Sequence, residues 1–185
     1  MPSLSDIATA ASLAHHGLLT SIETMTLLDV DLASVPAQHL ASLASCVTKR
    51  MGLTNVTNCD IISILDCLNI DSPNSCLNFN CQTLGNEETR AVVRAMESNV
   101  ETLFLGMSTH INDFMSLDMM ALTQYNGQGK CVKVKYMGRK YTYIEELVKW
   151  AQRINWEVEE EGCLKYYRDY YHYFYFIIVK RKQDQ

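Results

Sequence analysis

The chain has 185 residues and a formal net charge of −5, with 48% hydrophobic and 20% charged residues. This balance predicts one folded domain over residues 1–185 and excludes an intrinsically disordered chain, which is poorer in apolar residues. No apolar run reaches the roughly 18 residues that cross a bilayer, and the N-terminus lacks a signal-peptide pattern, so the sequence predicts no membrane partner.

The cysteine pattern indicates a reducing compartment. The chain has seven cysteines, an odd number, and none of their spacings forms a CxxC pair. Unpaired and mostly buried thiols are typical of cytosolic proteins, so we expect a cytoplasmic location.

The first 24 residues are predicted to form a helical N-terminal cap. Ser3 or Ser5 can cap a helix that carries an apolar stripe, and Gly17 is expected to break or kink it.

A repeat of 26 residues begins after this cap and is the strongest pattern in the chain. Two apolar residues two positions apart recur at a fixed interval, in the pairs Met25/Leu27, Met51/Leu53, Leu77/Phe79 and Leu103/Leu105, and then after a shift Val132/Val134 and Trp156/Val158. A fixed period of this length predicts an α/β fold, a short right-handed solenoid of about five to six strand–helix repeats over 25–158. Successive strands should pair in parallel and stack Leu27, Leu53, Phe79, Leu105 and Val134 in one buried column.

Amphipathic segments between the strands predict the helices of the repeats. A loop with Pro36 precedes the first, Glu87 and Glu88 begin a later one, and the last two are expected near 117–125 and 142–153. Residues 159–185 are predicted to form an irregular C-terminal strand cap with a tyrosine-rich excursion.

The repeat resembles the leucine-rich repeat of the ribonuclease-inhibitor-like class. The spacing Leu-x-Leu-x-x-(Asn/Cys)-x-Leu is matched best by Met25/Leu27/Val30/Leu32 and Leu77/Phe79/Gln82/Leu84. The Asn or Cys of the family pattern is replaced by Val30, Val56, Gln82 and Ser108. The chain is similar to the repeat tail of cytosolic nucleotide-binding leucine-rich-repeat receptors, which implies a role in innate immunity.

This resemblance implies a non-catalytic module that recognises a protein through the concave strand surface and a tyrosine-rich C-terminal loop. Residues at alternate strand positions face away from the core, and aromatic side chains are frequent at interfaces. The predicted protein-binding residues are Phe104, Lys133, Lys135, Tyr136, Tyr166, Tyr167, Tyr170 and Tyr171. For the tyrosines, an aromatic capping hairpin is an equal alternative. The alternative function of the chain is that of a structural, oligomerising or autoinhibitory repeat domain of a larger protein. Enzymatic activity is the third hypothesis.

Other motifs give weaker signals. The basic, aromatic stretch 130–143 is followed closely by acidic residues, which argues against nucleic acid. The adjacent His15 and His16, and Cys76 with Cys81, lack the spacing of a metal site. No GxSxG motif or Gly-rich phosphate loop is present, so the sequence predicts no enzyme, no cofactor and no metal. The identity of the protein partner and the oligomeric state stay open.

Overall fold

The computed structural model describes residues 3–68, 70, 72–80, 84–106, 124–138, 141–167 and 171–182. For residues 80, 141–143, 165–167 and 171–174 it describes the backbone alone. In chain order the elements are α1 (Leu4–His15), β1 (Ile22–Asp31), α2 (Ala37–Ser45), β2 (Val47–Thr57), α3 (Ile61–Asp66), β3 (Cys76–Asn80), α4 (Asn86–Ser98), β4 (Thr102–Gly106), β5 (Lys133–Gly138), α6 (Tyr141–Arg153), β6 (Trp156–Tyr167) and β7 (Tyr171–Arg181).

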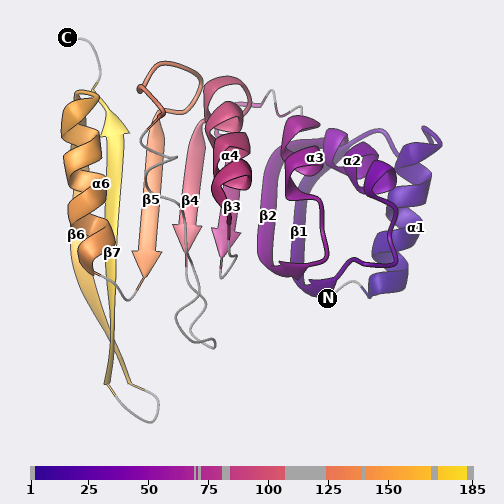
Figure 1. Ribbon diagram of the computed structural model, residues 1–185, viewed down its shortest axis with the longest axis horizontal. Coiled ribbons are helices and arrows are strands. Elements are labelled where there is room, and N and C mark those ends of the chain that lie inside the picture. The colour runs from indigo at the N-terminus through magenta and orange to yellow at the C-terminus, as the bar shows by residue number, and fades with distance from the viewer. Residues whose placement is uncertain are drawn as a thin grey trace.

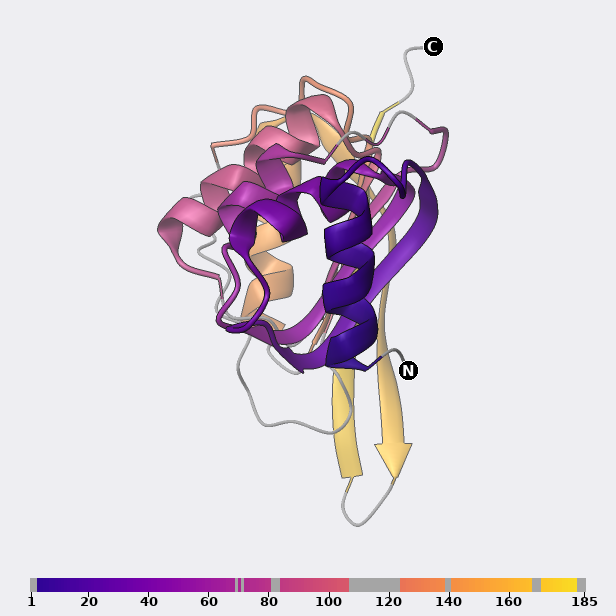
Figure 2. The same ribbon diagram turned by 90° about the vertical axis from the view of Figure 1, so that its right-hand side faces the viewer.

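The strands form one seven-stranded sheet in the order β1-β2-β3-β4-β5-β7-β6. The strands from β1 to β5 pair in parallel, whereas β7 pairs antiparallel with both β5 and β6. The helices α2, α3, α4 and α6 lie on one side of this sheet, and α1 packs against α2 at the β1 end (Figures 1 and 2). No described helix covers the opposite face, which we call the open face.

The N-terminal helix begins as its sequence predicts. Ser3 accepts a hydrogen bond from the backbone N–H of Asp6, and the Asp6 carboxylate accepts one from the backbone N–H of Ser3. This reciprocal capping box satisfies two N–H groups that a helix start leaves without partners. Gly17, with φ of +71°, follows the helix, which ends at His15.

The 26-residue spacing sets the register of the first four strands. Leu27 pairs with Leu53, Leu53 with Phe79, and Phe79 with Leu105, and all four side chains are buried. The prediction for the fifth strand is wrong by two residues, because Leu105 pairs with Tyr136 and Val134 pairs with Leu103. The column toward the helices therefore continues through Tyr136 to the buried Ile177 of β7, and Val134 belongs to the neighbouring column.

The core lies between this sheet and the helices. Each helix turns one apolar stripe toward the strands, as expected for an amphipathic helix on a sheet. The buried helical residues include Leu40 and Leu43 of α2, Ile64 and Leu65 of α3, Val92 and Met96 of α4, and Ile144, Leu147 and Trp150 of α6. Pro36 precedes α2, and Glu87 and Glu88 lie in the first turn of α4, as predicted. The predicted helix near 117–125 falls almost entirely outside the described residues.

The predicted solenoid is wrong. A solenoid adds each strand in parallel beside the previous one, whereas here β7 runs antiparallel between β5 and β6. The structure is instead an α/β fold on a mixed sheet. The C-terminal segment is no irregular cap, because β6 and β7 form a long antiparallel pair within the main sheet (Figure 1).

An aromatic cluster fixes the C-terminal end of the core. Tyr125, Trp150 and Trp156 lie with ring centroids 5.6–6.3 Å apart, and the Arg181 guanidinium lies 5.8 Å from the Trp156 ring. Arg181 Nη2 donates to the backbone oxygens of Gly129 and Cys131 at 2.8 and 2.9 Å. β7 is thereby tied to the chain that leads into β5.

Within the described part of the chain, no helix is long and apolar enough to cross a membrane.

Candidate functional site

The open face of the sheet carries a hollow of about 670 Å³ that extends from β1 to β5. Two rows of side chains from neighbouring strands line it, because alternate residues of a strand point to the same face. The first row is Thr24, Arg50, Cys76, Thr102 and Lys133, and the second is Thr26, Gly52, Asn78, Phe104 and Lys135. Asn74, Glu101 and Val132 lie at the end where the strands begin.

Two cations in the hollow have no acidic partner. Neither Arg50 on β2 nor Lys135 on β5 forms an ion pair with any residue that the structure describes. Glu23 on β1 feels the charge of Arg50, but its carboxylate accepts a hydrogen bond from Lys49 at 2.8 Å. Two positive charges, one on the exposed Arg50 and one on the half-buried Lys135, therefore remain in the hollow of a protein whose net charge is −5.

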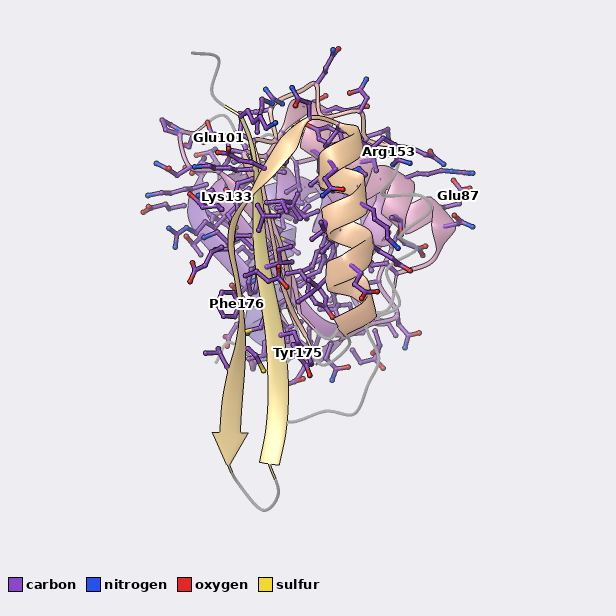
Figure 3. All side chains as sticks on the ribbon, turned by 90° about the vertical axis from the view of Figure 1, so that its left-hand side faces the viewer. Glu87, Glu101, Lys133, Arg153, Tyr175 and Phe176 are labelled. Atoms are coloured by element: carbon purple, nitrogen blue, oxygen red, sulfur yellow. The ribbon has the colours of Figure 1, made fainter. Side chains whose placement is uncertain are left out.

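The third cation of the hollow is neutralised by β6. Lys133 Nζ lies 2.7 Å from a carboxylate oxygen of Glu159, and Lys180 of β7 lies 3.4 Å from the other oxygen of the same group. The hydrogen bond from Lys133 lowers the pKa of Glu159. Figure 3 shows Lys133, Glu101 and Phe176 on the side of the sheet away from α6.

The neutral polar groups of the hollow are one amide and three hydroxyls. Asn78 lines the hollow, and its Oδ1 is buried without a hydrogen-bond partner among the described residues. Thr24, Thr26 and Thr102 add hydroxyl groups, which donate or accept. The Glu101 carboxylate at the rim accepts a hydrogen bond from the backbone N–H of Asn74 at 2.7 Å. This set suits a ligand that accepts hydrogen bonds and carries negative charge.

Small residues and one ring shape the floor. A Cβ on Gly52 would lie 3.0 Å from Thr26 Oγ1, so the Thr26 side chain occupies the place that a side chain at position 52 would take. A Cβ on Gly106 would lie 2.7 Å from the Phe104 ring, which therefore extends along its own strand over that glycine. The ring gives the hollow an apolar surface next to the polar row.

The thiol in the hollow is not an activated nucleophile. Burial raises the pKa of Cys76, and the charges of Arg50 and Lys135 act in the opposite direction with smaller effect. The thiol is therefore protonated at neutral pH, and a protonated thiol is a poor nucleophile. It contributes a small apolar wall between the two cations.

A histidine cluster lies where α1 packs against α2, outside the residues that line the hollow. The rings of His15 and His39 stack with centroids 4.3 Å apart, and His16 lies 6.4 Å from His39. Desolvation lowers the pKa of His39, followed by the charges of the other two rings. Across the described ranges, no three His, Cys, Asp or Glu side chains are arranged to hold a metal ion.

The predicted site residues divide into three groups. Phe104, Lys133 and Lys135 line the hollow, on the face where the sequence placed them. Tyr136 is 4% exposed and belongs to the core column, so the prediction that it lies on the open face is wrong. The backbones of Tyr166, Tyr167 and Tyr171 lie in β6 and β7, but their side chains, and all of Tyr170, are outside the described part.

The sequence analysis missed the row that begins with Thr24, Arg50 and Cys76. These residues precede the apolar pairs by one position, and the strands begin earlier than the pairs suggest. Extending the alternation two residues toward the N-terminus of each predicted strand would have found them.

Comparisons with known proteins give structural neighbours alone, since no protein-family model and no curated protein matches the chain. The chain is similar to precorrin-6y C5,15-methyltransferase from Geobacter metallireducens GS-15, at TM-score 0.39 and 8% identity over 98% of this chain and 90% of that one. It is also similar to magnesium protoporphyrin IX methyltransferase from Synechocystis PCC 6803 with bound SAM, at TM-score 0.38 and 10% identity over 97% of this chain and 79% of that one. A third similar structure is M. jannaschii TYW2 in complex with AdoMet, at TM-score 0.36 and 12% identity over 98% of this chain and 78% of that one.

The mixed sheet corrects the leucine-rich-repeat resemblance, because β7 runs antiparallel between β5 and β6. The conclusions drawn from the resemblance are corrected with it: the non-catalytic recognition module and its repeat-domain alternative, the link to innate immunity, and the absence of enzymatic activity. At TM-scores of 0.36–0.39 the likeness itself assigns no activity and no ligand to this chain.

Proposed function

We propose that the hollow on the open face binds a small organic anion, with Arg50 and Lys135 as its charge partners. The observation that carries this proposal is the pair of cations without acidic partners in a concave site of about 670 Å³ on an acidic protein. A hollow of this size is within the range of small-molecule sites. The threonine hydroxyls and the amide of Asn78, which can donate hydrogen bonds, are compatible with the same ligand chemistry.

The expected compartment is the cytosol. Six of the seven cysteines are described, and all six are free thiols. Free thiols are typical of a reducing compartment, where small organic anions are abundant metabolites.

Titration calorimetry with citrate tests the proposal on the intact chain at low salt. We expect saturable binding that weakens about tenfold in Lys135→Met and in Arg50→Met, because each removes one charge-assisted contact of about 1.4 kcal/mol. Lys149→Met is the matched control, since it removes the same charge from an exposed position on α6, on the helix side of the sheet. It should leave the affinity unchanged.

S-adenosylmethionine is the comparison probe, because two of the similar structures hold it. Absence of citrate binding would contradict the proposal. So would tight binding of either probe that survives both hollow substitutions, since the ligand site would then lie elsewhere on the chain.

A further inference from the structure

We propose that the ligand of the hollow is an elongated dianion with an uncharged middle, held by one anionic group at each end. This inference rests on the proposed function and names the ligand class. It follows from how charge is distributed along the hollow.

The two free cations stand at opposite ends. Arg50 belongs to β2 and Lys135 to β5, so β3 and β4 lie between them. Three strand spacings of about 4.8 Å each separate their backbones. A single small carboxylate cannot accept hydrogen bonds from both side chains unless both fold inward over the middle of the site.

The side chains of β3 and β4 that line the hollow are uncharged. β3 contributes Cys76 and Asn78, and β4 contributes Thr102 and Phe104, while the Glu101 carboxylate lies at the rim before β4. Burial raises the pKa of the Cys76 thiol, and the Phe104 ring lies along the sheet over Gly106. An apolar chain or ring fits this surface between the two cations.

The acidic groups near the hollow leave the two ends positive. Glu159 is bound to Lys133 and Lys180, and Glu101 accepts the Asn74 N–H at the rim. Lys133 neighbours Lys135 on the same face of β5, so the β5 end has two cations and one bound carboxylate. The β2 end has Arg50, whose planar guanidinium suits bidentate recognition of a carboxylate or phosphate.

Suberate and octanoate provide the test, because these two carboxylates have the same chain length and differ by one anionic end. We expect suberate to bind the intact protein about tenfold more tightly than octanoate in calorimetric titrations. Arg50→Met and Lys135→Met should each reduce the affinity for suberate to that for octanoate. The affinity for octanoate should fall only about twofold, because its single carboxylate can bind at either end of the hollow and one end remains. The double variant should lose both ligands, and an unchanged thermal midpoint shows that it folds.

Equal affinities of the two ligands for the intact protein would overturn the dianion inference while leaving anion binding in place. The inference also fails if Lys135→Met abolishes both ligands and Arg50→Met affects neither, since the site would then have one charged end. If the intact protein binds neither carboxylate and no citrate, the proposed function fails as a whole.

Discussion

Gly52 makes room for the Thr26 side chain at the β1 end of the hollow. Thr26 is its neighbour across the strand pair, and an added Cβ would meet the threonine hydroxyl at 3.0 Å. A side chain at position 52 would therefore have to displace Thr26 toward the hollow or extend into the hollow itself.

Substitution of this glycine tests the hollow without changing any charge. Gly52→Val should weaken citrate and suberate binding at least tenfold, because the branched side chain and the Thr26 side chain that it displaces would fill part of the hollow, while valine is well suited to a strand. The measurement is the same calorimetric titration, with circular dichroism as the check on folding. Full affinity in a folded Gly52→Val protein would show that the ligand does not enter this part of the hollow.

Substitution of Phe79 tests the buried column that runs from Leu27 to Leu105. It is fully buried between Leu53 and Leu105, so Phe79→Ala removes a large side chain that the neighbours cannot replace. We expect a loss of about 3–5 kcal/mol in the free energy of unfolding, measured by urea denaturation. Leu164→Ala, at a position 53% exposed on β6, should cost well under 1 kcal/mol, and equal costs would refute the column.

At the scale of the element, β7 depends on the contacts of one arginine. Arg181 donates to the backbone oxygens of Gly129 and Cys131 and lies over Trp156 at the end of the core. Its Nε is buried and has no partner among the described residues, so the guanidinium depends on those carbonyls.

Arg181→Met should destabilise the protein by about 2 kcal/mol, because it removes the charged hydrogen bonds to the backbone oxygens of Gly129 and Cys131. Urea denaturation measures the loss, and Lys182→Met provides a neighbouring, exposed control with the same change of charge. Equal stability of the two variants would mean that the Arg181 contacts do not hold β7 to the sheet.

The elements also show what the sequence was able to predict. The spacing from Leu27 to Leu105 encodes which residues face the helices, and the strands pair in that register. Apolar alternation does not encode strand direction or order, because an antiparallel strand has the same period of two. The insertion of β7 beside β5 was therefore not predictable from the repeat, and the solenoid inferred from it was wrong.

The candidate site was predictable in part for a similar reason. Alternation identified Phe104 and Lys135 as facing away from the core, but it mistook Tyr136 for a neighbour of theirs on that face. The absence of an acidic partner for Arg50 depends on which strands lie beside β2, and sequence spacing carries no such information.

At the scale of the whole molecule, buried acidic protons link stability to pH. Burial raises the pKa of the Cys131 thiol to about 12 from 9.0 and that of the Tyr125 hydroxyl to about 12 from 10.0. Both side chains are fully buried, and Tyr125 donates a hydrogen bond to the backbone oxygen of Cys131 at 2.9 Å. The folded state therefore holds these protons at a pH where the unfolded chain has released them.

The sign of the effect follows from which state binds more protons. Below pH 9 the folded and the unfolded states both keep these protons, and the stability is fully present. Above pH 9 the unfolded chain loses its thiol proton first, so the free energy of unfolding falls as pH rises toward 12. Urea denaturation at pH 7.5, 9.5 and 10.5 should show this fall, with a slope of about 1.4 kcal/mol per pH unit from each group that has ionised only in the unfolded chain. Cys131→Ala should lower stability at pH 7.5 and make the fall between pH 9 and 10 shallower, because one thiol no longer titrates, although Cys59 and Cys76, whose pKa values burial also raises, still contribute. A Cys131→Ala protein with the same slope as the parent over that interval would show that the buried thiol is not the group that links unfolding to alkaline pH.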